Sequence, residues 1–313
     1  MMNKTAVLYH YYDLNVSYRE NMTYFLSVAL RNDVDFYIIT AGKVLNFEFP
    51  KCANLQIIET ENINLDYGGY CQAIEILGEK VRKYEEIFFI NSSVRGPFFK
   101  NKKIDWMRLF TSRFNDKVHL VGSSINILNP DTKDSQEYQR LHGGEPPFIH
   151  VQTTAYAMSG CLMRALIGQG FYNQREPLKK SEVIFTYEIG LSQRAMGYGF
   201  GIDAVLPKYQ GHNYLTLNGD FNPTSRSGDP LRRGAYFGKT PKPRDLVFIK
   251  TNRRLIKSYA LDWYTLNGLL KVDNKKIKLW VEYHALRRRL ILRMVKRSLF
   301  ACLIVFGLCL LAV

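Results

Sequence analysis

Largely apolar runs alternate with amphipathic segments along most of the chain. The apolar runs, which suit strands of a buried sheet, lie at residues 5–10, 35–40, 55–59, 86–90, 118–122, 148–158, 200–206 and 245–250. Helical spacing of apolar residues predicts helices at 21–31 and 70–84, followed by 161–167 and a helix that opens at 181 or 186 and ends at 196. This alternation predicts an α/β domain with a mainly parallel sheet flanked by helices.

Two stretches interrupt the alternation. Residues 129–147 are rich in polar residues, Gly and Pro, and residues 211–243 are rich in Gly, Pro and Asn. Long excursions of this kind in a compact domain are often lids or acceptor sites. We therefore expect irregular structure at both places.

The character of the chain changes after about residue 250. Residues 280–297 read as a helix with a basic face, and residues 299–313 are almost purely apolar. A spanning helix needs roughly 20 apolar residues, so this run is a little short. A short transmembrane helix and a tail embedded in one leaflet both remain open. The alternative is a C-terminal core helix of a soluble domain.

The net charge favours anionic partners. The chain has 43 Lys and Arg against 28 Asp and Glu, which gives +15, and such an excess attracts phosphates, nucleotides, acidic lipid surfaces or nucleic acid. The densest basic cluster, residues 287–297, adjoins the apolar tail. This placement favours a membrane surface, and no basic–aromatic motif supports nucleic-acid binding. The five cysteines show no metal-ligand spacing.

A polar triplet directly follows the strand predicted at 86–90. Asn91, Ser92 and Ser93 come first, and Arg95 follows in a turn that ends in Gly-Pro. Ligands of open α/β sheets bind just beyond the carboxyl ends of the strands. The triplet therefore marks a candidate site, and a plain exit from strand to turn is the alternative.

A second candidate lies where a helix opens after the third predicted strand. Asp66 precedes Gly68 and Gly69. Glycines let a ligand approach the backbone, and a helix N-terminus favours phosphate. The alternative is a helix N-cap at Asp66 with the glycines as a bend. The spacing matches neither a Walker loop nor GxGxxG.

Six short sequence segments are informative when taken together. In chain order they are LDYGGY, FFINSSVRGPF, HLVGSSIN, HVQTTAYAMS, YEIGLSQRAMGYG and VFIKTNR. Together they resemble a family of glycosyltransferase-like proteins with an Asn-Ser-Ser-x-Arg-Gly-Pro signature, similar in outline to the rhamnan-synthesis glycosyltransferases of polysaccharide loci. The resemblance covers roughly residues 5–253. It implies a GT-A (Rossmann-like) fold and transfer of a hexosyl or deoxyhexosyl group from a nucleotide-sugar donor.

The resemblance over residues 5–253 and the change in charge and hydropathy after residue 250 together predict a division of the chain. Residues 1–250 are expected to form a GT-A-like catalytic domain, residues 251–297 a basic helical linker and residues 298–313 a hydrophobic membrane anchor. A lipid-linked or glycan acceptor would explain the anchor, with the catalytic domain on the cytoplasmic side.

Site roles follow from the resemblance, residue by residue. Asn91, Ser92 and Ser93 are expected to hold the nucleotide sugar together with Asp66, Gly68 and Gly69. Tyr9 is a candidate for stacking on the base, or else a core residue. Arg95 is expected to steady the diphosphate, with a salt bridge in the turn as the alternative.

Glu188 matches the acidic residue that accepts the proton of the attacking hydroxyl in inverting GT-A enzymes; pairing with the helix dipole is its alternative. A single displacement with inversion follows from this assignment. His150 and Gln152 are expected on the acceptor side. Lys250 and Arg253 either close over phosphates or form a solvated basic turn.

The residues expected at the metal position differ from the family pattern. GT-A strands usually end in Asp-x-Asp, which holds a divalent cation against the diphosphate, whereas this chain has Asn91, Ser92 and Ser93. Hard cations prefer carboxylate oxygen. Mn²⁺ or Mg²⁺ is therefore held elsewhere, replaced by basic groups and backbone N–H, or absent. His212 resembles the late histidine of some GT-A metal sites, or is a surface residue.

Two functions remain in competition. One is a glycosyltransferase; the other is a catalytically inactive, membrane-tethered protein that binds nucleotide sugar or glycan.

Overall fold

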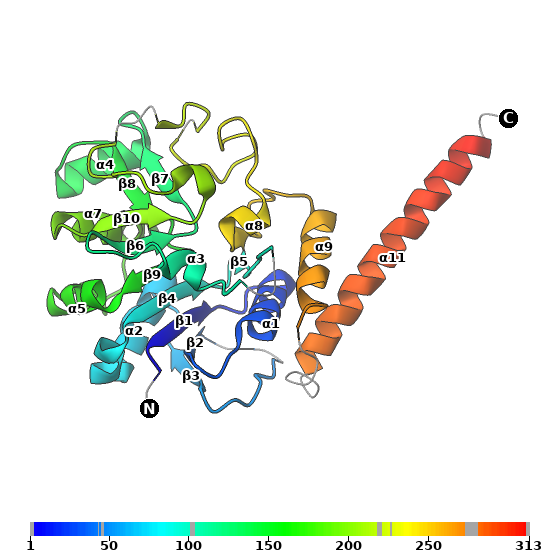
Figure 1. Cartoon of the computed structure of the whole chain (residues 1–313), viewed down its shortest axis with the longest axis horizontal. Coiled ribbons are helices and arrows are strands. Elements are labelled where there is room, and N and C mark those ends of the chain that lie inside the picture. The colour runs from blue at the N-terminus through cyan, green and yellow to red at the C-terminus, as the bar shows by residue number, and fades with distance from the viewer. Residues whose placement is uncertain are drawn as a thin grey trace.

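The computed structural model describes residues 3–42, 44, 47–100, 104–217, 221–225, 227–272 and 281–310, with side chains up to residue 300. Its centre is a seven-stranded sheet in the order β10-β6-β9-β4-β1-β2-β3. The strands are β1 (Thr5–Tyr11), β2 (Asp35–Ala41), β3 (Leu55–Thr60), β4 (Glu86–Asn91), β6 (Val118–Gly122), β9 (Ala155–Ser159) and β10 (Gly201–Ala204). The predicted α/β fold with a mainly parallel sheet is confirmed, and Figure 1 shows helices on both faces of it.

β9 is the antiparallel member of this sheet. It pairs antiparallel with β4 and with β6, whereas the pairs β1–β2, β1–β4, β2–β3 and β10–β6 are parallel. Two small antiparallel sheets add β5 (Val94–Arg95) with β11 (Ile249–Lys250), and β7 (Ile125–Leu128) with β8 (Phe148–Val151). The sheet is therefore mixed, and the carboxyl ends of β1 and β4 share one edge.

Alternating residues of β1 show how the sheet is covered. Tyr9 packs its ring 4.6 Å from that of Phe25 in α1 (Val16–Ala29). The next residue, His10, faces Tyr70 in α2 (Leu65–Leu77), with the ring centroids 5.9 Å apart. Because successive side chains of a strand point to opposite faces, α1 and α2 cover opposite faces of the sheet.

The remaining helices follow the prediction in part. They are α3 (Arg108–Thr111), α4 (Lys133–His142), α5 (Gly160–Gly168), α6 (Lys180–Val183), the π-helix η2 (Ile184–Ile189), α7 (Gly190–Gly197), α8 (Pro243–Leu246) and α9 (Ser258–Leu269), with the 3-10 helices η1 (Gly78–Lys83) and η3 (Pro207–Tyr209). Ser159 caps α5, as its hydroxyl accepts from Leu162 N.

Three local predictions need correction. The excursion at 129–147 contains α4, because Thr132 caps a helix whose buried side is Ser135 and Tyr138. The run at 148–158 divides into β8 and β9, which belong to different sheets. The run at 245–250 is split between α8 and the two residues of β11.

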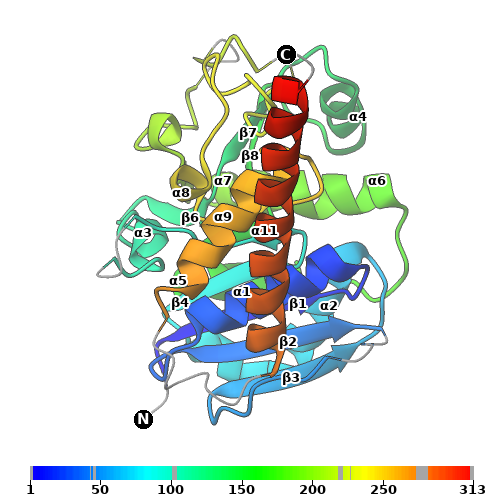
Figure 2. The same ribbon diagram turned by 90° about the vertical axis from the view of Figure 1, so that its right-hand side faces the viewer.

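The C-terminal helices pack against α1. Helix α11 (Val281–Leu310) lies beside both α9 and α1 (Figures 1 and 2), and its Tyr283, Leu286 and Leu290 are buried. The predicted linker and anchor thus meet within one helix, and residues 311–313 lie outside the described residues. Among the described residues, no helix is long and apolar enough to cross a membrane, so the predicted transmembrane helix is not found.

Candidate active site

The first turn of α2 brings Asp66 to the carboxyl end of β4. Asn91 Nδ2 donates to Asp66 Oδ2 at 2.9 Å. Asn91 Oδ1 in turn accepts from Ser93 N at 3.1 Å and from Ser93 Oγ at 2.6 Å. The structure therefore brings together three residues that the sequence analysis placed in the donor site: Asp66, Asn91 and Ser93.

Ser92 is committed to the fold instead. Its N–H donates to His10 O at 2.9 Å, and its hydroxyl accepts from Tyr12 N at 3.2 Å. Its carbonyl accepts from Asn21 Nδ2 at 2.9 Å. These bonds hold the ends of β1 and β4 together, and the Ser92 side chain is buried.

Glu188 lies in the π-helix η2, partly buried. Burial raises the pKa of its carboxyl, and the negative charge of Asp66 raises it further. The charges of Lys250 and Arg253 oppose this shift. Among the described residues, no cation forms an ion pair with Glu188 within 4.0 Å. Glu188 therefore lies close enough to Asp66 for the two charges to interact.

Lys250, at the end of β11, lies close enough to Glu188 and Asp66 for their charges to interact. The pairing of β11 with β5 sets Lys250 opposite Val94, and Thr251 N donates to Ser93 O at 3.0 Å. Burial lowers the pKa of the Lys250 ammonium, and Arg253 lowers it further, while Glu188 raises it. The charges of Asp66, Glu188, Lys250 and Arg253 thus influence one another at the carboxyl edge of the sheet. Such an arrangement suits an anionic ligand with hydroxyl groups.

Gln152 connects these charged groups to the expected acceptor side. Its Nε2 donates to Asn126 Oδ1 at 2.5 Å and to Asp229 Oδ1 at 2.6 Å. Asp229 also pairs with Arg253. His150 lies 3.4 Å from Asn126 through Nε2, and burial lowers the pKa of its imidazole to about 4. Both predicted acceptor-side residues therefore belong to a network that ends at Arg253.

The glycines after Asp66 have a packing role. A Cβ on Gly69 would lie 2.4 Å from His10 Cδ2, and one on Gly68 would lie 2.0 Å from Ile63 O. Both residues are buried within α2. Gly69 lets α2 approach β1, and Gly68 lets the first turn of α2 lie against Ile63, so close packing takes the place of the expected approach of a ligand.

Tyr9 and Arg95 do not point into the site. Tyr9 is buried against Phe25 in the core, which leaves no face for a base. Arg95 is buried on the α1 side: its Nη2 lies 3.1 Å from Glu20 Oε2 and its Nε donates to Asn21 Oδ1 at 2.8 Å. The predicted contact of Arg95 with a diphosphate is replaced by a buried salt bridge.

His212 lies at the opposite edge of the sheet. It lines a cavity of about 540 Å³ with Val118 and Gly201, which begin β6 and β10. Its Nε2 lies 3.2 Å from Lys208 O, and its ring packs against Phe221. The structure therefore separates His212 from Asp66 and Asn91.

The donor set at the polar triplet does not fit a hard divalent cation. Asn91 Oδ1 and the Ser92 hydroxyl both already accept hydrogen bonds from the chain, and such cations prefer several free carboxylate oxygens. Within the described part of the chain, no group of three or more His, Cys, Asp or Glu is arranged to hold a metal ion.

Two residues of the candidate site, Asn21 and Asp229, were not predicted from the sequence. Asn21 donates to both Ser92 O and Thr251 Oγ1, which ties the turn after β4 to the segment after β11. Asp229 lies in the irregular region between β10 and α8. Neither shows a local motif, because their partners lie 71 and 77 positions away along the chain.

Comparisons with known proteins give fold-level likenesses. No family model and no curated protein matches the chain. Among solved structures, galactosyltransferase LgtC in complex with donor and acceptor sugar analogues is 10% identical over 63% of this chain and 73% of that chain, with a TM-score of 0.34. An active-site mutant of LgtC is 10% identical over 78% and 86%, with a TM-score of 0.38.

A third likeness is to the apo structure of the bifunctional glycosyltransferase WbbM. It is 9% identical over 89% of this chain and 52% of that chain, with a TM-score of 0.39. All three are glycosyltransferases by name, but at such TM-scores they carry no argument about this chain's site or reaction.

Proposed function

We propose that this chain is a glycosyltransferase that moves a sugar from a nucleotide-sugar donor to a hydroxyl of a glycan or lipid-linked acceptor. The observation that carries the proposal is Glu188, whose carboxyl has a raised pKa and no ion-pair partner among the described residues. It shares one edge of the sheet with Asp66, Asn91 and two cations. The sequence resemblance to glycosyltransferase-like proteins points to the same chemistry.

Donor binding is assigned to the Asp66–Asn91–Ser93 unit and to the two cations. Asp66 accepts from hydroxyl groups of the ribose or sugar. Lys250 and Arg253 neutralise the diphosphate, the role first expected of Arg95. A charge-assisted contact to phosphate is about twice as strong as a neutral hydrogen bond.

Glu188 is the proposed general base. The acceptor oxygen attacks the anomeric carbon while its proton passes to Glu188. The bond from that carbon to the phosphate oxygen breaks, and its electron pair leaves with the nucleoside diphosphate. A base whose pKa is raised toward the working pH is suited to this step, and one displacement inverts the anomeric centre. His150 and Gln152 line the acceptor side.

The membrane is the proposed location. We place the catalytic domain at the cytoplasmic face, held by an apolar tail that lies in the membrane surface. This location brings the site close to a lipid-linked acceptor.

A second candidate is a membrane-tethered binding protein without turnover. It is favoured by the polar triplet, which stands where related enzymes hold a metal and does not offer a metal's ligands. It predicts donor binding with no reaction.

The deciding experiment uses the full-length chain and a panel of nucleotide sugars, with and without Mn²⁺. Binding is measured by calorimetry and turnover by release of nucleoside diphosphate. We expect one donor to be turned over, Glu188→Gln to stop turnover while binding persists, and Glu145→Gln, an exposed control, to have no effect. Binding without turnover, with acceptors supplied, would establish the second candidate. A chain that binds no donor would refute both.

A further inference from the structure

Five of the six Lys and Arg residues of α11 fall into two sets. Arg289, Arg293 and Arg297 recur every fourth position and point toward the body of the protein. Arg293 lies 3.1 Å from both Glu20 and Asp262, and Arg297 lies 2.6 Å from Asp262. These pairs, with the buried Tyr283, Leu286 and Leu290, fix the first half of α11 against α1 and α9. The neutralised set is therefore structural.

The outer side of α11 carries the other set. Arg288 and Lys296 are exposed, and no acidic residue occurs from residue 283 to residue 313. The same part of α11 also carries exposed apolar side chains: Ile291, Leu292, Val295, Leu299 and Phe300. A helix that presents apolar and basic residues together, without acids, is typical of the water–membrane interface.

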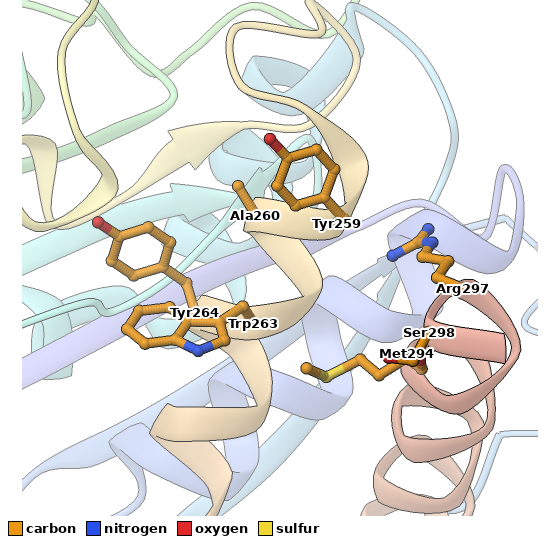
Figure 3. Close-up of a pocket in the computed structure, with 7 residues that line it drawn as sticks. All are labelled: Tyr259, Ala260, Trp263, Tyr264, Met294, Arg297 and Ser298. Carbon is orange, nitrogen blue, oxygen red and sulfur yellow. Dashed lines mark hydrogen bonds between the residues drawn. The ribbon is translucent and has the colours of Figure 1, made fainter. Parts of the chain in front are cut away.

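A groove runs between α9 and α11. It has a volume of about 720 Å³ and is lined by Tyr259, Ala260, Trp263, Tyr264, Met294, Arg297 and Ser298. Figure 3 shows Tyr259 and Trp263 on α9, across from Met294 and Arg297 on α11. Trp263 is 45% exposed and Tyr259 56% exposed. The Lys257 ammonium lies 5.8 Å from the Tyr259 ring at the rim.

We propose that this groove binds the alkyl chain of an anionic lipid while the outer side of α11 lies on the bilayer. The volume suits a single ligand chain. Tyr and Trp prefer the level of the headgroups, and Lys257 and Lys296 are placed to meet a lipid phosphate. The proposal stands whether or not the protein is an enzyme.

The basic and apolar side chains on the outer side of α11 favour a membrane over a second copy of the chain or a nucleic acid. In a symmetric dimer the same surface meets itself, so Arg288 and Lys296 would face their own copies with no acid to compensate. A nucleic acid would leave Leu292, Val295 and Leu299 without an apolar partner. An anionic bilayer satisfies both kinds of side chain.

The test is binding of the full-length chain to vesicles of phosphatidylcholine, with and without phosphatidylglycerol. We expect Lys296→Glu to weaken binding to the anionic vesicles about tenfold or more, since each basic residue near such a surface contributes measurably. Arg232→Glu makes the same charge change at an exposed position of the body and should leave binding unchanged. Equal losses in both variants would overturn a specific surface.

The groove is tested separately with bromine-labelled acyl chains, which quench nearby tryptophan. We expect quenching that is lost in Trp263→Phe and reduced in Ala260→Phe, which narrows the groove and leaves the charge unchanged. Circular dichroism confirms that each variant is folded. Vesicle binding without quenching of Trp263 would overturn the groove assignment. Self-association of the chain in sedimentation, with Trp263 shielded from the lipid, would assign the surface to a second copy.

Discussion

Two charged clusters lie on either side of the turn that follows β4, and they are built differently. On the α1 side, Glu20 lies within 4.0 Å of Arg95, Arg289 and Arg293. At the carboxyl edge, Glu188 and Lys250 influence each other's pKa but form no ion pair among the described residues.

The difference separates structure from chemistry. A buried charge is costly unless it is paired, so the cluster at Glu20 has its charges compensated from within the chain. In the cluster at Glu188, the charges of Glu188 and Lys250 form no ion pair among the described residues, and burial shifts the pKa of both groups. Shifted groups that remain available are the ones expected at functional sites.

The sharpest test of the comparison is to neutralise one carboxylate from each cluster. We expect Glu188→Gln to lower kcat by ~10²–10⁴-fold, the usual contribution of a general base, with donor affinity retained. Glu20→Gln should leave kcat within a few-fold. Steady-state kinetics and donor titration measure both. Equal losses of kcat in the two variants would erase the distinction.

The next largest effect is expected at Arg95. Arg95→Met removes a buried cation from beside Glu20, and breaking one partner of a buried pair costs about 3–5 kcal/mol of unfolding free energy. Urea denaturation measures the loss, and Arg232→Met, at an exposed position, serves as the control. If the variant keeps its stability but loses donor affinity, Arg95 contacts the diphosphate and the structural role is wrong.

Lys250→Met tests the other side of the comparison. Loss of a charged hydrogen bond of about 1.5–3 kcal/mol predicts that the donor dissociation constant rises by roughly 10- to 100-fold. Stability should change little or rise, because burial disfavours the ammonium and lowers its pKa. Calorimetry with the donor checks the first part, and Lys239→Met is the matched surface control. Unchanged donor affinity would show that Lys250 does not bind the donor.

The smallest effect concerns pH. The pKa of Glu188 is higher in the folded chain than in the unfolded chain, so its favourable contribution is complete below the unfolded pKa and is lost as pH rises through the folded pKa. We expect the unfolding free energy of the unaltered protein to fall relative to Glu188→Gln across that interval. Parallel pH profiles for the two proteins would mean that Glu188 is not perturbed.

Sequence reasoning succeeded where the information was local. The strands and most helices follow from apolar spacing, and Asp66, Asn91 and Ser93 were placed together because each stands at a strand or helix end. Arg95 was misassigned although it stands in the same turn. Its direction is decided by Glu20 and Thr265, and the latter lies 170 positions away. The direction of a side chain from a turn depends on such distant partners.

Glycines 68 and 69 show a related limit. The pattern of two glycines at a helix start is shared by ligand sites and by tight packing, and the sequence does not distinguish them. The structure does, since His10 and Ile63 fill the space that a Cβ would need.

The reversed direction of β9 has a consequence for how the walls of the site are held. Asn91 N donates to Thr154 O at 3.1 Å, so β9 enters the sheet at the edge where β4 leaves it. Three residues join β8 to β9, which makes the wall with His150 and Gln152 short and anchored at both ends. The wall with Asp229 belongs instead to the long irregular segment between β10 and α8. One side of the site is thus a short segment held between two strands, and the other is a long segment where loop variation can alter the site without disturbing the sheet.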